Sequence, residues 1–279
     1  MSRGDYSWPV NVAPRVAGFW LGYTAIFIAL GLFLGMAPPA ARLLVAGTLI
    51  TLVSLALTYA LTRSEGISLS AVGAGWTTGS ERRFLVGFAV GIAMVFLLLM
   101  LSRIALGPVT FVRVPEIGLR SIALMVVTYV TLSAGEELGF RGYPFQRLRQ
   151  RYGTVAAQLV VALAFAAYHM LQGWHPINAL IGTTAGSILF GVATIVSGGL
   201  AFPIGMHAAW NIGTWMLGTK GDAGYWRMDL AAQPSFAAGA LVYLAVMGLT
   251  MAAMCWWMRS RAGSLQHQHE ERVGFDAPR

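Results

Sequence analysis

Long apolar runs, interrupted by polar residues, glycine and proline, dominate the chain from residue 16 onward. A helix of about twenty apolar residues is long enough to cross a hydrocarbon core of about 30 Å. The pattern therefore predicts an all-α, polytopic membrane protein with about eight transmembrane helices. The predicted spans are 16–37, 43–62, 84–107, 119–140, 154–171, 177–197, 199–218 and 236–258.

The composition supports a membrane protein and excludes other classes. Hydrophobic residues make up 57% of the chain and charged residues 11%, which is about half the charged share of a soluble domain. The single cysteine, Cys255, cannot form an internal disulfide. The net charge of +8 comes from basic residues between the apolar runs, so it does not indicate a nucleic-acid partner.

The basic residues predict the orientation of the chain, because cytoplasmic loops carry an excess of Lys and Arg. About thirteen of the nineteen basic residues fall on the side that holds both termini and the second, fourth and sixth loops. We expect a multi-pass protein of the plasma (inner) membrane with both termini in the cytoplasm. Residues 1–261 form the predicted transmembrane domain, and the polar residues 262–279 are expected to be a disordered cytoplasmic tail.

Several ionisable and amide side chains lie inside the predicted spans, where they are costly and usually pair or function. For each one alone, a buried polar contact that fixes helix packing is the alternative explanation. These side chains are Glu136, Glu137, Arg141, His169, His207 and Asn211.

Helical geometry separates the two glutamates. Glu137 and Arg141 are four residues apart on one face, where they can form a structural ion pair. Glu136 points about 100° away from Glu137, so it is left free in a poorly solvated position that suits a general base. Glu136 lies seventeen positions before Gly153, and His169 lies sixteen positions after it. A chain reversal near Tyr152-Gly153 would therefore bring His169 to a depth in the membrane similar to that of Glu136.

His207 and Asn211 are also four residues apart and project from one face of the seventh predicted span. An imidazole beside an amide offers hydrogen-bond donors without a nucleophile. This combination suits the stabilisation of a developing oxyanion.

Three motifs in this order resemble those of the CPBP intramembrane protease family, which includes the CAAX prenyl endopeptidases of the Rce1 type and bacteriocin self-immunity proteins. The resemblance covers about residues 119–218, the motif-bearing core of the predicted transmembrane protease domain. The motifs are Glu136-Glu137-x-x-x-Arg141, Phe165-x-x-x-His169 and His207-x-x-x-Asn211.

The resemblance implies a role for each of four residues. Glu136 and His169 would activate water, while His207 and Asn211 would stabilise the oxyanion. It also implies that the helices enclose an intramembrane catalytic cavity that opens toward the cytoplasm.

The sequence leaves the metal requirement open. Glu136, His169 and His207 could supply three ligands to Zn²⁺ with a fourth position open, or they could act directly on water. We expect no metal cofactor, because Asn211 is a poor zinc ligand and a good oxyanion donor.

We therefore expect an intramembrane endopeptidase, a hydrolase that cleaves a peptide bond near the cytoplasmic membrane face. Its expected partners are membrane lipids and a peptide or membrane-protein substrate. One alternative is a non-catalytic scaffold or bacteriocin-immunity protein with the same fold. Another is a proton-coupled transporter in which Glu136 and His169 relay protons, although a relay gives Asn211 no particular role.

Overall fold

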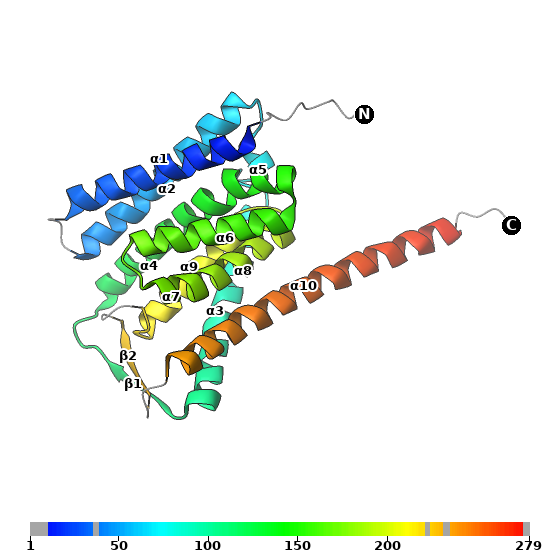
Figure 1. Ribbon diagram of the computed structural model, residues 1–279. Helices are drawn as coiled ribbons and strands as arrows, with labels where there is room; N and C mark the ends of the chain where they lie inside the picture. The colour runs from blue at the N-terminus through cyan, green and yellow to red at the C-terminus, as the bar shows by residue number, and fades with distance from the viewer. Residues whose placement is uncertain (1–10, 36–38, 221–223, 231–234, 276–279) are drawn as a thin grey trace.

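The computed structural model describes residues 11–35, 39–220, 224–230 and 235–275, without the side chains of 39–41 and 261–275. These residues form a bundle of helices with one small sheet (Figure 1). The long helices are α1 (Val12–Leu34), α2 (Pro39–Ser64), α3 (Ser80–Leu106), α4 (Leu119–Arg141), α6 (Thr154–Leu171), α8 (Thr184–Ser197), α9 (Ala201–Met216) and α10 (Phe236–Phe275). The shorter elements are η1 (Leu69–Val72), β1 (Val109–Arg113), α5 (Tyr143–Tyr152), α7 (Pro176–Asn178), the π-helical η2 (Ala179–Thr183) and β2 (Trp226–Leu230).

The all-α, polytopic fold is confirmed. Seven described helical segments are long and apolar enough to cross a membrane, and they correspond to seven of the predicted spans. Two of these segments combine neighbouring elements: 119–152 joins α4 and α5, and 176–197 joins α7, η2 and α8. The remaining predicted span, 199–218, corresponds to α9, which has only 16 residues. A helix of this length is shorter than the roughly twenty residues that cross a hydrocarbon core unaided.

The chain reversal predicted near Tyr152-Gly153 is also present, because α5 ends at Tyr152 and Gly153 has a φ of 84°.

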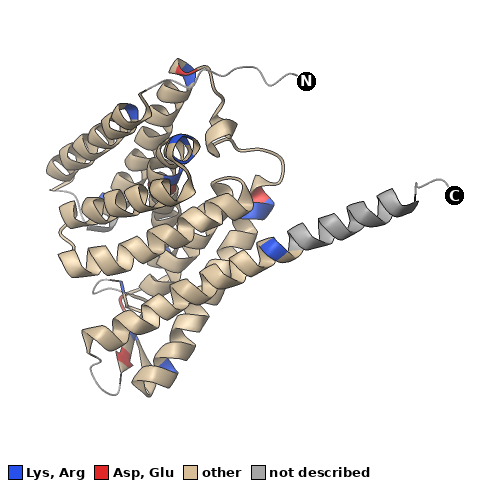
Figure 2. Cartoon of the chain, turned by 45° about the vertical axis from the view of Figure 1, so that its right-hand side comes forward, with Lys and Arg blue, Asp and Glu red and all other residues tan. Residues whose placement is uncertain are grey.

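The bundle has two distinct ends. We call the end where α1 begins, α2 finishes and α5 lies the terminal end, because both chain termini extend from that side (Figure 1). The opposite end, where β1 pairs antiparallel with β2, is called the strand end. Charged residues gather toward these two ends, and the helical segments between them are almost free of charge (Figure 2).

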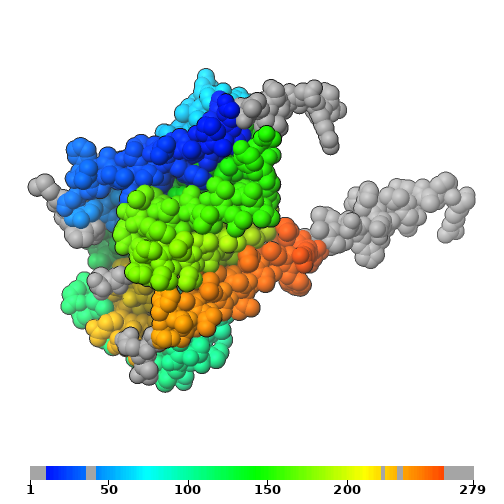
Figure 3. All heavy atoms as spheres, viewed as in Figure 1, coloured from blue at the N-terminus to red at the C-terminus, as the bar shows by residue number. Residues whose placement is uncertain are grey.

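Helices α1, α6 and α10 lie on one outer face of the bundle (Figure 3). Large apolar side chains on these and other helices are exposed. Phe33 is 85% exposed and Val155 is 73% exposed. Exposed apolar side chains of this size fit contact with lipid tails, because lipid imposes no penalty on an apolar surface.

Glycines bring the site-bearing helices unusually close to their neighbours. A Cβ atom added to Gly87 of α3 would lie 2.0 Å from the carbonyl oxygen of Phe202 in α9, so no side chain fits there. In the same way, a Cβ atom on Gly135 of α4 would lie 2.4 Å from Ile50 Cγ2 in α2. The backbones of α9 and α4 are therefore fixed against α3 and α2, which sets the positions of the side chains they carry.

The carboxyl-terminal region is helical as far as the structure describes it, and the disordered tail over 262–279 stays a prediction. Helix α10 continues through Phe275, while residues 276–279 lie outside the described part of the chain. Extending an existing helix adds one hydrogen bond per residue without a new nucleation cost, and this segment contains Leu, Gln, Glu and Arg, which favour helix. The boundary of the transmembrane domain at residue 261 stays a prediction.

Candidate active site

Three helices bring the candidate catalytic residues to a single pocket of about 580 Å³. Helix α4 supplies Glu136, α6 supplies His169, and α9 supplies His207 and Asn211. All four side chains line the pocket, and all four residues are buried. The residues singled out in the sequence are therefore neighbours in space, although their roles stay predictions.

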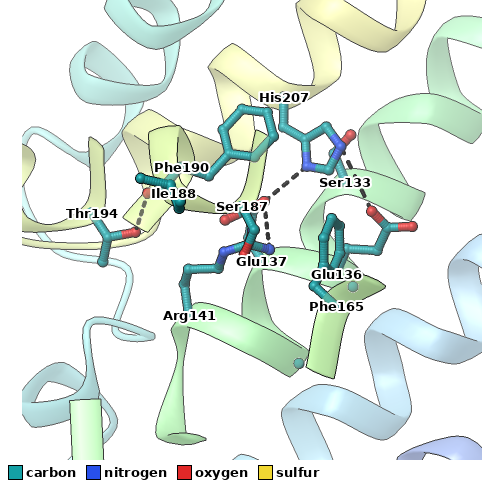
Figure 4. Close-up of polar contacts among 12 residues, drawn as sticks. Ser133, Glu136, Glu137, Arg141, Phe165, Ser187, Ile188, Phe190, Thr194 and His207 are labelled. Carbon is teal, nitrogen blue, oxygen red and sulfur yellow. Dashed lines mark hydrogen bonds and ion pairs between the residues drawn. The ribbon is translucent and has the colours of Figure 1, made fainter. Parts of the chain in front are cut away.

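His207 lies between the two glutamates (Figure 4). Its Nδ1 is 2.8 Å from Oε1 of Glu137, and its Nε2 is 3.6 Å from Oε2 of Glu136. The ring of Phe190 stacks on the imidazole at a centroid distance of 4.3 Å and holds its plane. The sequence predicts an ion pair of Glu137 with Arg141 only, and the structure adds the contact of Glu137 with His207.

The guanidinium of Arg141 lies beside Glu137, with 3.5 Å between Nη1 and Oε1 and no exposure of either side chain. It also lies over the ring of Phe165, 4.4 Å from the centroid. Glu137 therefore contacts both Arg141 and His207, and so links the helix turn that carries the glutamates to α9.

The imidazole of His169 has a defined tautomer when neutral. Its Nδ1 is 2.8 Å from the backbone carbonyl oxygen of Phe165. A carbonyl oxygen only accepts hydrogen bonds, so Nδ1 carries the hydrogen and Nε2 keeps its lone pair. Phe165 and Trp174 pack edge-on against the ring at centroid distances of 4.4 and 5.1 Å. Among the described contacts, His169 and Glu136 share no direct hydrogen bond.

The amide of Asn211 is held at both ends. Its Nδ2 donates to Oγ of Ser133 at 3.2 Å, and its Oδ1 accepts from Nζ of Lys220 at 2.5 Å. Lys220 lies just beyond the end of α9 and lines the same pocket. Sequence reasoning missed this residue, although one signal was available: Lys220 is the only lysine among the nineteen basic residues of the chain.

Burial lowers the pKa of the Lys220 ammonium to about 8, while the nearby carboxylate of Glu136 acts in the opposite direction. The charge of Lys220 therefore responds to pH within one or two units of neutrality.

The donors that could serve as zinc ligands are not arranged as a metal site. Within the described ranges, no three His, Cys, Asp or Glu side chains form a group that could hold a metal ion. Both ring nitrogens of His207 face carboxylates, and Nδ1 of His169 is bound to a carbonyl oxygen. The hydrogen bond of Nδ1 also leaves Nε2 of His169 with its lone pair, so the expectation of no metal cofactor stays a prediction.

The pocket extends from these residues toward the strand end of the bundle. Its wall there includes Trp174, Lys220, Met228, Leu230 and Phe236, whereas α5 and the start of α1 lie at the opposite end. In this structure, two expectations from the sequence consequently exclude each other. If both termini are cytoplasmic, the pocket opens toward the other face of the membrane; if the pocket opens to the cytoplasm, the termini are outside.

Fold and site together define a multi-pass integral membrane protein with a buried carboxylate, imidazole and amide site. Residues 118–213 match the model of the family described as type II CAAX prenyl endopeptidase Rce1-like. The matched segment contains all three motifs, which agrees with the family resemblance of the sequence and supports a membrane protease of this type. No curated protein matches the chain.

Proposed function

We propose that the protein is an intramembrane endopeptidase that hydrolyses a peptide bond inside the pocket. The family supports a CAAX-type protease in general. The observation that carries the finer proposal is the convergence of a carboxylate, two imidazoles and an amide on one pocket within the membrane-spanning bundle. A proton relay or a scaffold would not require the amide of Asn211 to be there.

Glu136 and His169 activate the attacking water in this proposal. The carboxylate of Glu136 accepts a proton from water, and Nε2 of His169 orients the water by accepting its second hydrogen bond. The oxygen bonds to the carbonyl carbon of the substrate as the proton moves to Glu136. The carbon–nitrogen bond then breaks, and Glu136 returns this proton to the leaving amine.

His207 is proposed to stabilise the oxyanion with support from Glu137. A carboxylate that accepts from one ring nitrogen fixes the orientation of an imidazole, and Glu137 is 2.8 Å from Nδ1. The two glutamates and Arg141 sum to one negative charge. A proton on His207 would neutralise this group and would give Nε2 a hydrogen to donate to the oxyanion.

We also propose that this chemistry needs no metal cofactor. Support comes from the chemistry of Asn211, whose amide is a poor zinc ligand and a good oxyanion donor and which lines the same pocket. Exhaustive treatment with a membrane-permeant chelator, followed by metal analysis, tests this point. Activity should persist at substoichiometric zinc; loss that only Zn²⁺ reverses would make Glu136, His169 and His207 ligands.

The direct test is hydrolysis of a farnesylated CAAX peptide and its unprenylated counterpart by the purified protein in liposomes. Mass spectrometry identifies the cleaved bond, and Glu136→Gln is the control. Cleavage by the wild-type protein but not by Glu136→Gln supports the proposal. Comparison of the two peptides shows whether a prenyl group is required. Equal product from both proteins would contradict the proposal.

The proposed orientation has both termini in the cytoplasm, because the charge bias comes from this chain's own residues. The pocket then faces the other side of the membrane, so the substrate enters from that side and not from the cytoplasmic face. Reporter fusions after Arg261 and near Gln150 should report cytoplasm, while a fusion near Gly224 should report the opposite side. Reversed signals would restore hydrolysis near the cytoplasmic face.

A further inference from the structure

Lys220 is chemically exceptional in this chain. Eighteen of the nineteen basic residues are arginine, so the single lysine marks a place where an ammonium is used instead of a guanidinium. This ammonium reaches into the pocket that holds Glu136 and His207. It is a compact charge with three hydrogen-bond donors and no acceptor.

The contact with Lys220 fixes the orientation of the Asn211 amide. An ammonium can only donate, so the group 2.5 Å from Nζ must be the oxygen Oδ1 and not the nitrogen Nδ2. The two amide hydrogens therefore point away from Lys220. One of them goes to Oγ of Ser133 at 3.2 Å, and no acceptor among the described residues takes the other, which is available to an acceptor in the pocket.

Lys220 also has no strong competing partner in the part of the chain that the structure describes. Its ammonium lies 5.1 Å from the ring centroid of Tyr129, and no described carboxylate oxygen lies within 4.0 Å of it. Asp222 lies outside the described residues. The positive charge is therefore directed at the amide oxygen, where it withdraws electron density and strengthens the N–H donors at the other end.

We propose that Lys220 is a positioning residue that holds and polarises the Asn211 amide so that its free N–H donates to the oxyanion. This role deepens the proposed endopeptidase function and rests on it. Lys220 itself does not touch the reacting atoms in this proposal. Its contribution passes through Asn211, which makes the two residues a single functional unit.

The role of Lys220 predicts a pH dependence. Burial lowers the pKa of Lys220 to about 8, so the ammonium is lost as the pH rises through that value. The kcat should therefore fall with a midpoint near pH 8. The ionisable groups that line the pocket around Lys220 are Glu136 of α4, His169 of α6, His207 of α9 and Tyr243 of α10, with Tyr129 of α4 under the ammonium.

The first experiment compares Lys220→Met and Lys220→Arg with the control Arg227→Met in the liposome assay. Arg227 is a cation at the strand end of the bundle, as Lys220 is. Its side chain pairs with Asp229 and is 67% exposed, so the Arg227→Met change should leave kcat unchanged. Lys220→Met should lower kcat about tenfold to a hundredfold with little change in KM, and should remove the alkaline fall. Lys220→Arg should recover part of kcat and stay active past pH 9, because a guanidinium keeps its charge there.

A double-variant comparison tests whether Lys220 acts through Asn211. In an Asn211→Ala background, Lys220→Met should change kcat by less than about twofold, because the group it positions is gone. An equal loss in both backgrounds would overturn the proposal, as would wild-type kcat and pH profile in Lys220→Met. If Lys220→Met does not fold, the pH profile of Lys220→Arg decides alone: an alkaline fall still centred near pH 8 would contradict the proposal.

A third measurement does not depend on peptidase activity. Reductive methylation with ¹³C-formaldehyde labels only Lys220 and the amino terminus, so NMR can follow the titration of Lys220 directly. The Asn211→Ala change should lower its titration midpoint, because a hydrogen bond to the charged form is lost. An unchanged midpoint would remove the contact on which the inference rests, whereas an inactive protein with a shifted midpoint would count against the proposed function.

Discussion

Two groups of carboxylate and arginine with buried carboxylates lie in the bundle, and their surroundings differ. In the first, which we call the Glu65 cluster, Glu65 contacts Arg15, Tyr143 and Arg147. Oε1 of Glu65 is 2.9 Å from Arg15 and 2.6 Å from the Tyr143 hydroxyl, and Oε2 is 2.9 Å from Nε of Arg147. Both carboxylate oxygens are therefore occupied, and Glu65 does not line the pocket.

The second group, the Glu136 cluster, consists of Glu136, Glu137, Arg141 and His207. Here Glu136 faces the pocket, and its ion-pair neighbour among the described residues is the imidazole of His207 at 3.6 Å. Among the described residues, the Glu65 cluster has two permanent cations for one carboxylate, whereas the Glu136 cluster has one permanent cation for two. The Glu65 cluster therefore pairs its carboxylate with fixed charges, which suits structure, while the Glu136 cluster places a carboxylate and an imidazole side by side at the pocket, which suits chemistry.

The largest expected effect on turnover is that of Glu136→Gln. The amide cannot take a proton from water, and general-base catalysis contributes about a hundredfold to ten-thousandfold to rate. We expect hydrolysis to fall by about a thousandfold or more while thermal stability in detergent stays close to that of the wild type. Product analysis by mass spectrometry and an unfolding curve measure the two quantities. Full activity would remove Glu136 from the mechanism.

Asn211→Ala should have the next largest effect. Removing one donor to an oxyanion typically lowers kcat about a hundredfold to a thousandfold, and binding changes much less because the charge exists only in the transition state. His207→Ala should act similarly, and the two effects should be less than additive. Steady-state kcat and KM of the single and double variants provide the measurement; a loss of stability with normal kcat would instead indicate a packing role.

Glu137→Gln should lower both the stability of the protein and its turnover. The change leaves Arg141 buried without a carboxylate, and breaking a buried pair in this way costs about 3–5 kcal/mol. It also weakens the hold on Nδ1 of His207, so kcat should fall by about tenfold or more. Adding Arg141→Met should restore stability but not kcat. Recovery of both would show that Glu137 acts only as the partner of Arg141.

Glu65→Gln should have the smallest effect on turnover and still destabilise the protein. The glutamine amide cannot neutralise the positive charges of Arg15 and Arg147. The side chain at position 65 is only 1% exposed, so water cannot replace the lost carboxylate there. We expect a lower unfolding temperature with unchanged kcat per folded molecule below that temperature. Active-site titration corrects for the folded fraction; a selective fall in kcat at full folding would mean that the two clusters are coupled.

The sequence by itself determined the features that depend on local periodicity. Apolar runs predicted the spans, and the chain reversal at Gly153 followed from its breaker sequence. These predictions succeed because span length and helical spacing are properties of a short stretch of chain. That the motif side chains share one pocket was implied by the family resemblance and not by local spacing. The weak β signal of Val109–Arg113 and its pairing with Trp226–Leu230 were missed, because that pairing joins segments more than a hundred residues apart.

Only the tertiary structure decided how the polar residues combine. His207 is seventy residues from Glu137, and no periodicity indicates which of two adjacent glutamates its Nδ1 contacts. The contact depends on the rotation of α9 about its axis and on its distance from α4. Gly87 and Gly135 determine both, because they allow α9 and α4 to pack closely against α3 and α2. The same packing directs Lys220 to Asn211 and the pocket to the strand end, because contacts between distant segments depend on the whole bundle and not on any one helix.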